Sequence, residues 1–430
     1  MKKVLVYSHD TFGLGNIRRM LAISQGLLDH SSNLSILLVT GSPMIHSFRL
    51  SETGFDYLKL PCLNRNVEGQ YGARSLGMET SDLVKLRSQM ILAAAENFKP
   101  DVVVVDKKPF GVEHELKSTL DWLRSRGKGK AALLLRDILD CPTVTTRIWE
   151  KNNYFDAIER YYDRVLVVGS DKIFDVCKEY EFPNNIADKV KHCGYIKHQT
   201  KGTTASCSDH ILPNDKKLIL VTPGGGEDGF LLMDNYIRGL NEIKHCENFL
   251  SILVTGPEMP KFQRDIIQSA AKSYPNVLVK EFTNDLGSLI QQADLVVSMA
   301  GYNTVSEIVS MGKRAVVVPR TKPVKEQWIR AKRFEKRGLL TSIHPDTLTP
   351  SNLMQTIQTQ LLNSDSPMLN PSEFKGRSGV AQEINDLLSV PDSNTLRDDP
   401  NMAVISSKLK EFSDISKALL KTRRSIRPVA

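Results

Sequence analysis

Several residues in the second half of the chain have the types and spacing of a nucleotide-binding site. Residues 294–298 form an apolar run that predicts a strand ending at Ser298, and the small residues Ala300 and Gly301 follow before a predicted helix. The free N–H groups and the positive end of a helix after such a turn attract phosphate. Glu307 lies in the first turns of this helix, where its carboxylate could accept hydrogen bonds from a ribose diol. The pattern favours a nucleoside-diphosphate site, and the alternative is an ordinary βαβ unit.

A second polar loop follows in the same half of the chain. The strand predicted at 314–318 stops at Pro319, and Glu326 and Gln327 begin another helix. The combined stretch resembles the donor-binding half of GT-B glycosyltransferases, in particular the bacterial peptidoglycan N-acetylglucosaminyltransferase family. In that family a strand ending in Ser-x-x-Gly leads to Thr-Val-Ser-Glu, and a later loop carries Gln-Gln or Glu-Gln. The matching residues here are Ser298, Ala300, Gly301, Thr304, Val305, Ser306, Glu307, Glu326 and Gln327.

This resemblance implies how a donor would be held. Glu307 would bind the ribose hydroxyls of a UDP-sugar, the turn before it would line the pyrophosphate, and the later loop would contact the donor sugar. Members of the family invert the configuration of the sugar by activating the acceptor hydroxyl with a base. The donor-binding residues implied in this half of the chain are Ala300, Gly301, Asn303, Thr304, Glu307, Glu326 and Gln327.

The first loop of the chain also carries glycines that could approach a ligand. Gly13 and Gly15 resemble part of a dinucleotide fingerprint, but its third glycine is missing and the second predicted strand, 34–40, is followed by no acid. An NAD ribose would therefore lack its usual partner, which disfavours a dehydrogenase. As a glycosyltransferase loop, the two glycines would let the backbone approach the donor phosphates and the reacting sugar.

The identity of the catalytic base is open in this loop. Relatives usually have histidine where this chain has Asn16, and an amide cannot accept a proton at neutral pH, although it can position a hydroxyl. The candidates for the catalytic role are therefore His9 and Asn16. Arg18 could hold phosphate or an anionic acceptor, or it could form a surface salt bridge.

Two further loops complete the candidate site. Asp106 and Lys107 follow the apolar strand predicted at 101–106, and we expect them to contact the acceptor. Gly225 and Gly226 follow the strand predicted at 217–222 and suit backbone contact with the donor phosphates, with a glycine turn that binds no ligand as the alternative. The chain has no Asp-x-Asp triplet. We therefore expect a metal-independent enzyme with no metal ligands and no cofactor besides its UDP-sugar co-substrate.

The order of predicted elements indicates an α/β fold. Apolar strands alternate with amphipathic helices, which is typical of parallel sheets covered on both faces, and a chain of 430 residues exceeds one core. We expect the GT-B architecture: two doubly wound, Rossmann-like domains that face an interdomain cleft. The predicted divisions are an acceptor-side domain at 1–196, a linker at 197–214, a donor domain at 215–370, a crossover helix at 371–388 that packs back on the first domain, and a basic tail at 389–430.

Bulk composition restricts the class of protein further. The hydrophobic content of 41% and the charged content of 25% are those of a globular protein. The six cysteines show no metal-binding spacing, and no RNA-binding or zinc-finger pattern is present, so we expect no nucleic-acid partner. No apolar run approaches the roughly 20 residues that span a bilayer. We expect a cytoplasmic protein, and the basic tail leaves open peripheral association with the inner face of a membrane.

The main hypothesis is therefore a glycosyltransferase that moves a hexose or N-acetylhexosamine from a UDP-sugar to an unidentified acceptor. A lipid-linked acceptor at a membrane surface is one of the open choices. A UDP-N-acetylhexosamine 2-epimerase is the enzymatic alternative, because it shares the two-domain fold. A non-catalytic nucleotide-sugar-binding scaffold is the other alternative, motivated by Asn16 and by the basic tail.

Overall fold

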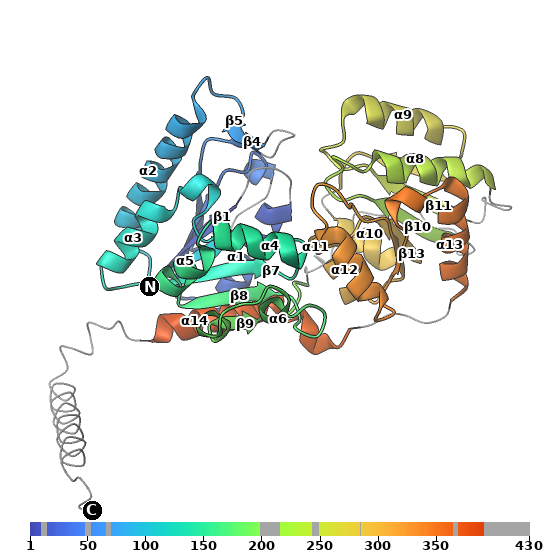
Figure 1. The fold of residues 1–430 in the computed structure, drawn as a ribbon. Helices are drawn as coiled ribbons and strands as arrows, with labels where there is room; N and C mark the ends of the chain where they lie inside the picture. Colours follow the sequence, from blue (N-terminus) through green and yellow to red (C-terminus); the bar gives the residue numbers. More distant parts are fainter. Residues whose placement is uncertain are drawn as a thin grey trace, which may run out of the picture.

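The computed structural model describes residues 1–9, 15–47, 53–65, 70–197, 216–242, 249–283, 285–363 and 369–390. Two parallel sheets lie side by side, each flanked by helices (Figure 1). The first has the order β3 (Phe55–Lys59), β2 (Leu34–Thr40), β1 (Lys2–Ser8), β6 (Val102–Asp106), β7 (Lys130–Arg136), β8 (Arg164–Val168) and β9 (Val190–His192). The second has the order β12 (Val277–Lys280), β11 (Phe249–Val254), β10 (Lys217–Thr222), β13 (Leu295–Ser298), β14 (Ala315–Val317) and β15 (Thr341–Ser342).

The central strands are buried on both faces, which explains their uninterrupted apolar sequences. All five residues of β6 are buried, and β1 pairs with it in parallel register, Leu5 opposite Val103. In each sheet the strand order reverses beside the first strand of the domain, between β1 and β6 and between β10 and β13. Ligands of open α/β sheets bind outside the carboxyl ends of the strands at such a reversal. The two doubly wound domains of the predicted GT-B fold are confirmed.

The helices surround these sheets in two groups (Figure 1). Those of the first domain are α1 (Gly15–His30), α2 (Thr80–Phe98), α3 (Lys117–Ser125), α4 (Pro142–Lys151), α5 (Tyr154–Tyr161), α6 (Val176–Glu179) and α7 (Asn184–Ala187). Those of the second are α8 (Phe230–Gly239), α9 (Lys261–Ala271), α10 (Leu286–Gln292), α11 (Tyr302–Ser310), α12 (Glu326–Glu335) and α13 (Pro350–Leu362). A small antiparallel hairpin, β4 (Leu63–Arg65) and β5 (Tyr71–Ala73), lies outside the main sheets. None of the described helices is long and apolar enough to cross a membrane.

One predicted helix is shorter than its sequence pattern indicates. The apolar spacing predicts a helix over 112–126, but α3 begins only at Lys117. Glu113 and His114 adopt positive φ angles of 45° and 63°, which interrupt a right-handed helix. Glu115 is buried and forms an ion pair of 2.6 Å with Arg87 of α2. This tertiary contact overrides the local periodicity.

The last described helix, α14 (Gly376–Ser389), returns to the first domain (Figure 1). It packs against α1, and its apolar face buries Val380, Ile384 and Leu387. Arg377 forms a 2.6 Å ion pair with Asp29 at the end of α1. The predicted linker at 197–214 lies outside the described residues except for its first residue, as does the predicted tail at 389–430 except for its first two.

Candidate active site at the domain junction

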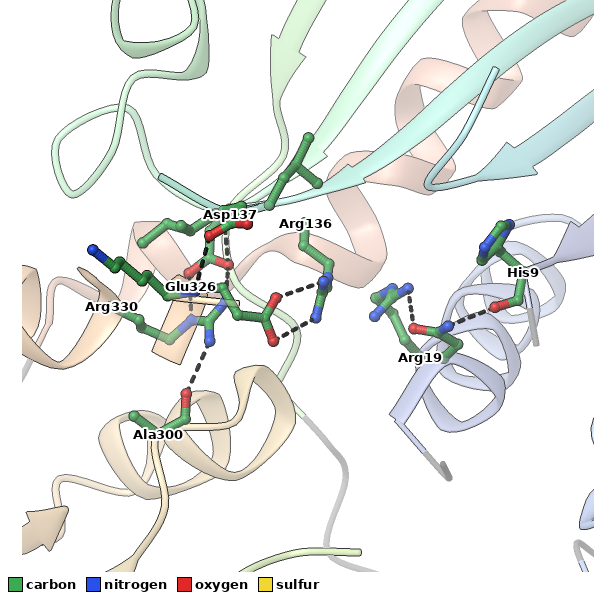
Figure 2. A network of polar contacts seen from close by, with 12 residues as sticks. His9, Arg19, Arg136, Asp137, Ala300, Glu326 and Arg330 are labelled. Carbon is green, nitrogen blue, oxygen red and sulfur yellow. Dashed lines mark hydrogen bonds and ion pairs between the residues drawn. The ribbon is translucent and has the colours of Figure 1, made fainter. Parts of the chain in front are cut away.

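The carboxyl ends of the two sheets face each other across the domain junction. The first turn of α1 and the carboxyl end of β7 in the first domain contact α11 and α12 of the second, the helices that follow β13 and β14. Figure 2 shows part of this network, in which Arg330 pairs with Asp137 and Glu326 pairs with Arg136 across the junction. The structure thus brings together most of the predicted site residues that it describes. Gly13 lies outside the described residues.

Glu307, the residue predicted to bind the ribose, lies on α11, the helix that follows β13. Gly301 precedes this helix as its N-terminal cap, and a Cβ atom placed on it would meet no atom within 4 Å. There is therefore open space at the N-terminus of α11 that a ligand could fill. The side chain of Glu307 is only 1% exposed, and Arg18 of α1 lies 3.2 Å from its Oε1 atom. Burial raises the pKa of Glu307, and Arg18 partly opposes this shift.

The N-termini of α1 and α11 meet across the junction. Asn303 Nδ2 donates a hydrogen bond of 3.0 Å to the carbonyl oxygen of Gly15. Both helix N-termini have a positive dipole end, so an anion between them would be stabilised by both helices. This arrangement suits the predicted diphosphate position, with Thr304 in the first turn of α11.

The residues of the first loop form a buried network around Arg19. Asn16 Nδ2 donates to the carbonyl oxygen of His9 (2.6 Å), and its Oδ1 accepts from Arg19 (3.1 Å) (Figure 2). Arg19 also donates to Asp106 Oδ1 (2.7 Å), while the N–H of His9 donates to Asp106 Oδ2 (3.3 Å). His9 is 1% exposed, and its Nε2 lies 3.5 Å from the hydroxyl of Tyr71. The amide of Asn16 therefore links the residue after β1 to the first turn of α1.

This network changes the interpretation of Asp106. The sequence placed it among the acceptor contacts, but both of its carboxylate oxygens are used within the protein. The side chain is 1% exposed because the Arg19 guanidinium, equally buried, covers it. Asp106 therefore positions Arg19 and the backbone of His9 in this structure, and a direct acceptor contact stays a prediction without support from these contacts.

Glu326 likewise has a partner from the other domain. Arg136, the last residue of β7, contacts both of its carboxylate oxygens, with distances of 2.5 and 3.1 Å (Figure 2). Burial alone would raise the pKa of Glu326, but Arg136 and the other nearby cations hold it below its ordinary value. Its neighbour Gln327 accepts a hydrogen bond from the backbone N–H of Arg320 (3.0 Å) and so braces the loop before α12. The predicted sugar contacts of both residues stay predictions.

Lys107 is a strained cation at the end of the central strand β6. Its φ angle of 72° is unfavourable for a residue with a side chain, and such strain concentrates at functional sites. Burial, strengthened by the positive charge of Arg136, lowers the pKa of Lys107 to about 7, although Glu326 opposes this shift. The ammonium group is thus close to losing its proton under ordinary conditions.

A pH-dependent stability follows from this shift. Above the folded pKa, the native state has released the Lys107 proton while the unfolded chain still holds it, so stability increases as pH rises from about 7 toward the ordinary lysine pKa. Between pH 7 and 8.5, we expect the wild type to gain about 1 kcal/mol more than Lys107→Met. Urea unfolding at both pH values measures this difference. Equal changes in the two proteins would contradict the depressed pKa.

The glycine turn after β10 has a structural explanation in addition to the predicted one. Gly226 has a φ angle of 101°, and a Cβ atom there would lie 2.3 Å from the carbonyl oxygen of Thr255. A Cβ on Gly225 would lie 2.5 Å from Oε2 of Glu258. The close packing of the loops after β10 and β11 therefore requires Gly226 with or without a ligand, whereas the flexible carboxylate of Glu258 could move away from a Cβ on Gly225. The predicted contact with donor phosphates is not needed to explain Gly226.

The sequence did not predict a buried ion pair that joins the two domains, which is formed by Arg330 and Asp137. Arg330 of α12 donates two hydrogen bonds to Asp137, of 2.7 and 2.9 Å, and a third of 2.9 Å to the carbonyl oxygen of Ala300 (Figure 2). Both charged side chains are 0% exposed. The guanidinium carbon also lies 5.7 Å from the ring centroid of Tyr302. One signal was available: Arg330 follows Glu326 by four residues, so both lie on the same face of α12.

Comparison with known proteins finds a family model that matches the second half of this chain. Residues 218–384 match the glycosyltransferase family 28 C-terminal domain. The chain is a glycosyltransferase of the GT-B type. The matched region holds the predicted donor residues from Gly225 to Gln327. The predicted class of enzyme and the predicted resemblance are confirmed.

Curated relatives cover most of this glycosyltransferase. The UDP-N-acetylglucosamine--N-acetylmuramyl-(pentapeptide) pyrophosphoryl-undecaprenol N-acetylglucosamine transferase of Oenococcus oeni is 23% identical over 389 residues, which are 87% of this chain and 94% of the relative. The enzyme of the same name from Finegoldia magna is 24% identical over 300 residues, 68% of this chain and 73% of the relative.

Solved structures agree on the fold. MurG of Acinetobacter baumannii superposes with a TM-score of 0.55 at 15% identity, covering 90% of this chain and 99% of that one. A UDP-GlcNAc 2-epimerase of Neisseria meningitidis bound to UDP-GlcNAc gives 0.58 at 14% identity, with the same coverage. The transferases and epimerases share this architecture, so the structural likeness alone does not separate them, whereas the family match favours the transferase.

Proposed function

We propose that this glycosyltransferase moves N-acetylglucosamine from UDP-N-acetylglucosamine to a hydroxyl of a lipid-linked, pyrophosphoryl-containing acceptor. One observation carries the donor side: the buried carboxylate of Glu307 lies on the same helix whose N-terminus borders open space at Gly301. A ribose diol on the carboxylate and a diphosphate at the helix N-terminus match the two ends of a UDP group. The names of the relatives supply the sugar and the acceptor class.

The proposed reaction is a direct displacement at the anomeric carbon. The acceptor oxygen forms a bond to that carbon, the bond to the β-phosphate oxygen breaks, and its electron pair leaves with UDP. The opposed N-termini of α1 and α11 would stabilise the charge that develops on UDP. The acceptor proton would pass to a base, for which His9 is the proposed group. Because His9 is 1% exposed, its neighbours must rearrange before an acceptor can reach the ring.

The first domain supplies the proposed acceptor side. Lys107 and Arg136 lie at the carboxyl ends of β6 and β7 and face the junction. Arg136, together with Lys107 while it holds its proton, suits the pyrophosphoryl group of a lipid-linked acceptor at this position. Peripheral association with a membrane is part of this proposal, because the acceptor would be anchored there. Metal independence also belongs to the proposal. Helix N-termini and arginine side chains would take the place of a metal ion.

The test combines binding with turnover. Calorimetry with UDP, UDP-N-acetylglucosamine, UDP-glucose, UDP-galactose, GDP-mannose and NAD should show selective binding of UDP and UDP-N-acetylglucosamine. Release of UDP should then require an added polyprenyl-pyrophosphoryl sugar. Conversion of UDP-N-acetylglucosamine to its 2-epimer without acceptor, followed by NMR, would instead favour the epimerase. Failure of every nucleotide to bind would contradict the proposed donor site.

A further inference from the structure

Arg18 lies on the carboxylate that the donor is proposed to use. It belongs to α1 in the first domain, whereas Glu307 belongs to α11 in the second, and Arg18 Nη2 lies 3.2 Å from Glu307 Oε1. The carboxylate is 1% exposed and the arginine side chain 33% exposed. The cation therefore covers a buried anion from across the domain junction. A ribose diol and this guanidinium would compete for the same oxygen.

The charge balance around Glu307 explains why a partner is needed in the empty site. Burial disfavours the ionised carboxylate and Asp285, at the start of α10, adds repulsion, while Arg18 favours the ionised form. A buried carboxylate that loses its cation must gain other hydrogen-bond donors or take up a proton. The two hydroxyls of a ribose are neutral donors that could take this place.

The position of Arg18 also places its charge near the expected diphosphate. It lies in the first turn of α1, whose first residue, Gly15, accepts the hydrogen bond from Asn303 at the N-terminus of α11. An arginine in this place can rotate from a carboxylate to a phosphate without movement of the backbone, because its stem is long and partly exposed. Phosphate then replaces the carboxylate as the anionic partner of the guanidinium.

We propose that Arg18 exchanges partners when the donor binds: it holds Glu307 in the empty site and contacts a donor phosphate once the ribose diol takes Glu307. This inference rests on the proposed UDP-sugar function and assigns Arg18 to the donor, not to the acceptor. A nucleoside without phosphates must displace Arg18 from Glu307 and provides no new anionic partner for the guanidinium. A nucleoside diphosphate offers a new partner. The exchange therefore makes Arg18 a determinant of selectivity for diphosphorylated donors.

The test compares uridine and UDP by calorimetry in the wild type and in Arg18→Met. The variant should bind uridine about three- to tenfold more tightly, because no ion pair has to be broken. UDP should gain nothing or bind more weakly, because the phosphate contact is lost. The ratio of the two dissociation constants, uridine over UDP, should therefore fall about tenfold or more. Arg18→Gln provides a second variant if Arg18→Met does not fold, as judged by circular dichroism.

A matched control separates this effect from a general loosening of the junction. Arg333 and Glu179 form another ion pair between the domains, 2.5 Å long, without contact to Glu307. Arg333→Met should leave both affinities unchanged. Unchanged or weaker uridine binding in the Arg18 variants, with UDP binding intact in the wild type, would overturn the exchange alone. Absence of UDP binding in the wild type would overturn the proposed donor site, and the exchange with it.

Discussion

Asp137→Ala should lower the free energy of unfolding by about 3–5 kcal/mol, the largest stability effect that we expect from a single substitution at the junction. The variant leaves the guanidinium of Arg330 without its hydrogen-bonded carboxylate at a place where both side chains are 0% exposed, although Glu326 still attracts it. Such a buried charge keeps its desolvation cost and loses the attraction that offset it. Urea unfolding followed by tryptophan fluorescence and circular dichroism measures the change.

Two further variants show whether the loss comes from the buried pair. Arg330→Met in the Asp137→Ala background removes the stranded charge, so the double variant should recover much of the lost stability. Arg333→Met breaks a pair in which the arginine is 40% exposed, and it should cost less than about 1 kcal/mol. A loss below about 1 kcal/mol in Asp137→Ala itself would contradict the structural role of the pair.

Glu307→Gln should weaken UDP binding by about a hundredfold while leaving the protein at least as stable as the wild type. A carboxylate accepts two charge-assisted hydrogen bonds from a ribose diol, whereas a glutamine amide offers one neutral oxygen. We expect no loss of stability because burial raises the pKa of Glu307, which means that the folded protein disfavours the charged form that Glu307→Gln removes. Calorimetry with UDP and thermal unfolding measure the two effects.

A surface carboxylate provides the control for this substitution. Glu281 pairs with Arg264 at the surface of the second domain, so Glu281→Gln should leave the UDP affinity unchanged. If Glu307→Gln binds UDP as tightly as the wild type, Glu307 does not bind the ribose. A large loss of stability in the same variant would instead show that the Arg18 pair is a structural contact, which would also weaken the proposed exchange.

We expect different roles for the ion pair of Asp137 with Arg330 and for that of Arg18 with Glu307. Asp137 and Arg330 are buried, and each guanidinium nitrogen of Arg330 donates a hydrogen bond, the third to the carbonyl oxygen of Ala300. This pair anchors the loop after β13 to the first domain. The pair of Arg18 and Glu307 is partly exposed on the arginine side. A fixed contact beside an exchangeable one would let the donor site rearrange without separation of the domains.

Local patterns in the sequence were sufficient for the elements and for the candidate donor loop. The four consecutive valines 102–105 predict a buried parallel strand because they give neither face of the strand a polar side chain for contact with solvent. The small turn at Gly301 before the helix with Glu307 predicts an anion-binding N-terminus because both features are contiguous in the chain. Where a distant contact competed, as in the buried pair of Glu115 and Arg87, the local pattern failed and α3 began later than predicted.

The tertiary structure alone decided which charges meet. Arg18 and Glu307 are 289 residues apart in sequence, and Arg136 and Glu326 are 190 apart. No local spacing encodes these pairs, since they depend on how the carboxyl ends of two separate sheets approach each other. Lys107 and Arg136 stand together for a different reason, because β6 and β7 are neighbouring strands of one sheet; there, burial and Arg136 lower the pKa of Lys107 to about 7. The sequence by itself determined which groups stand at the strand ends, and the docking of the two domains decided their partners, because charges interact through distance and burial and not through position in the chain.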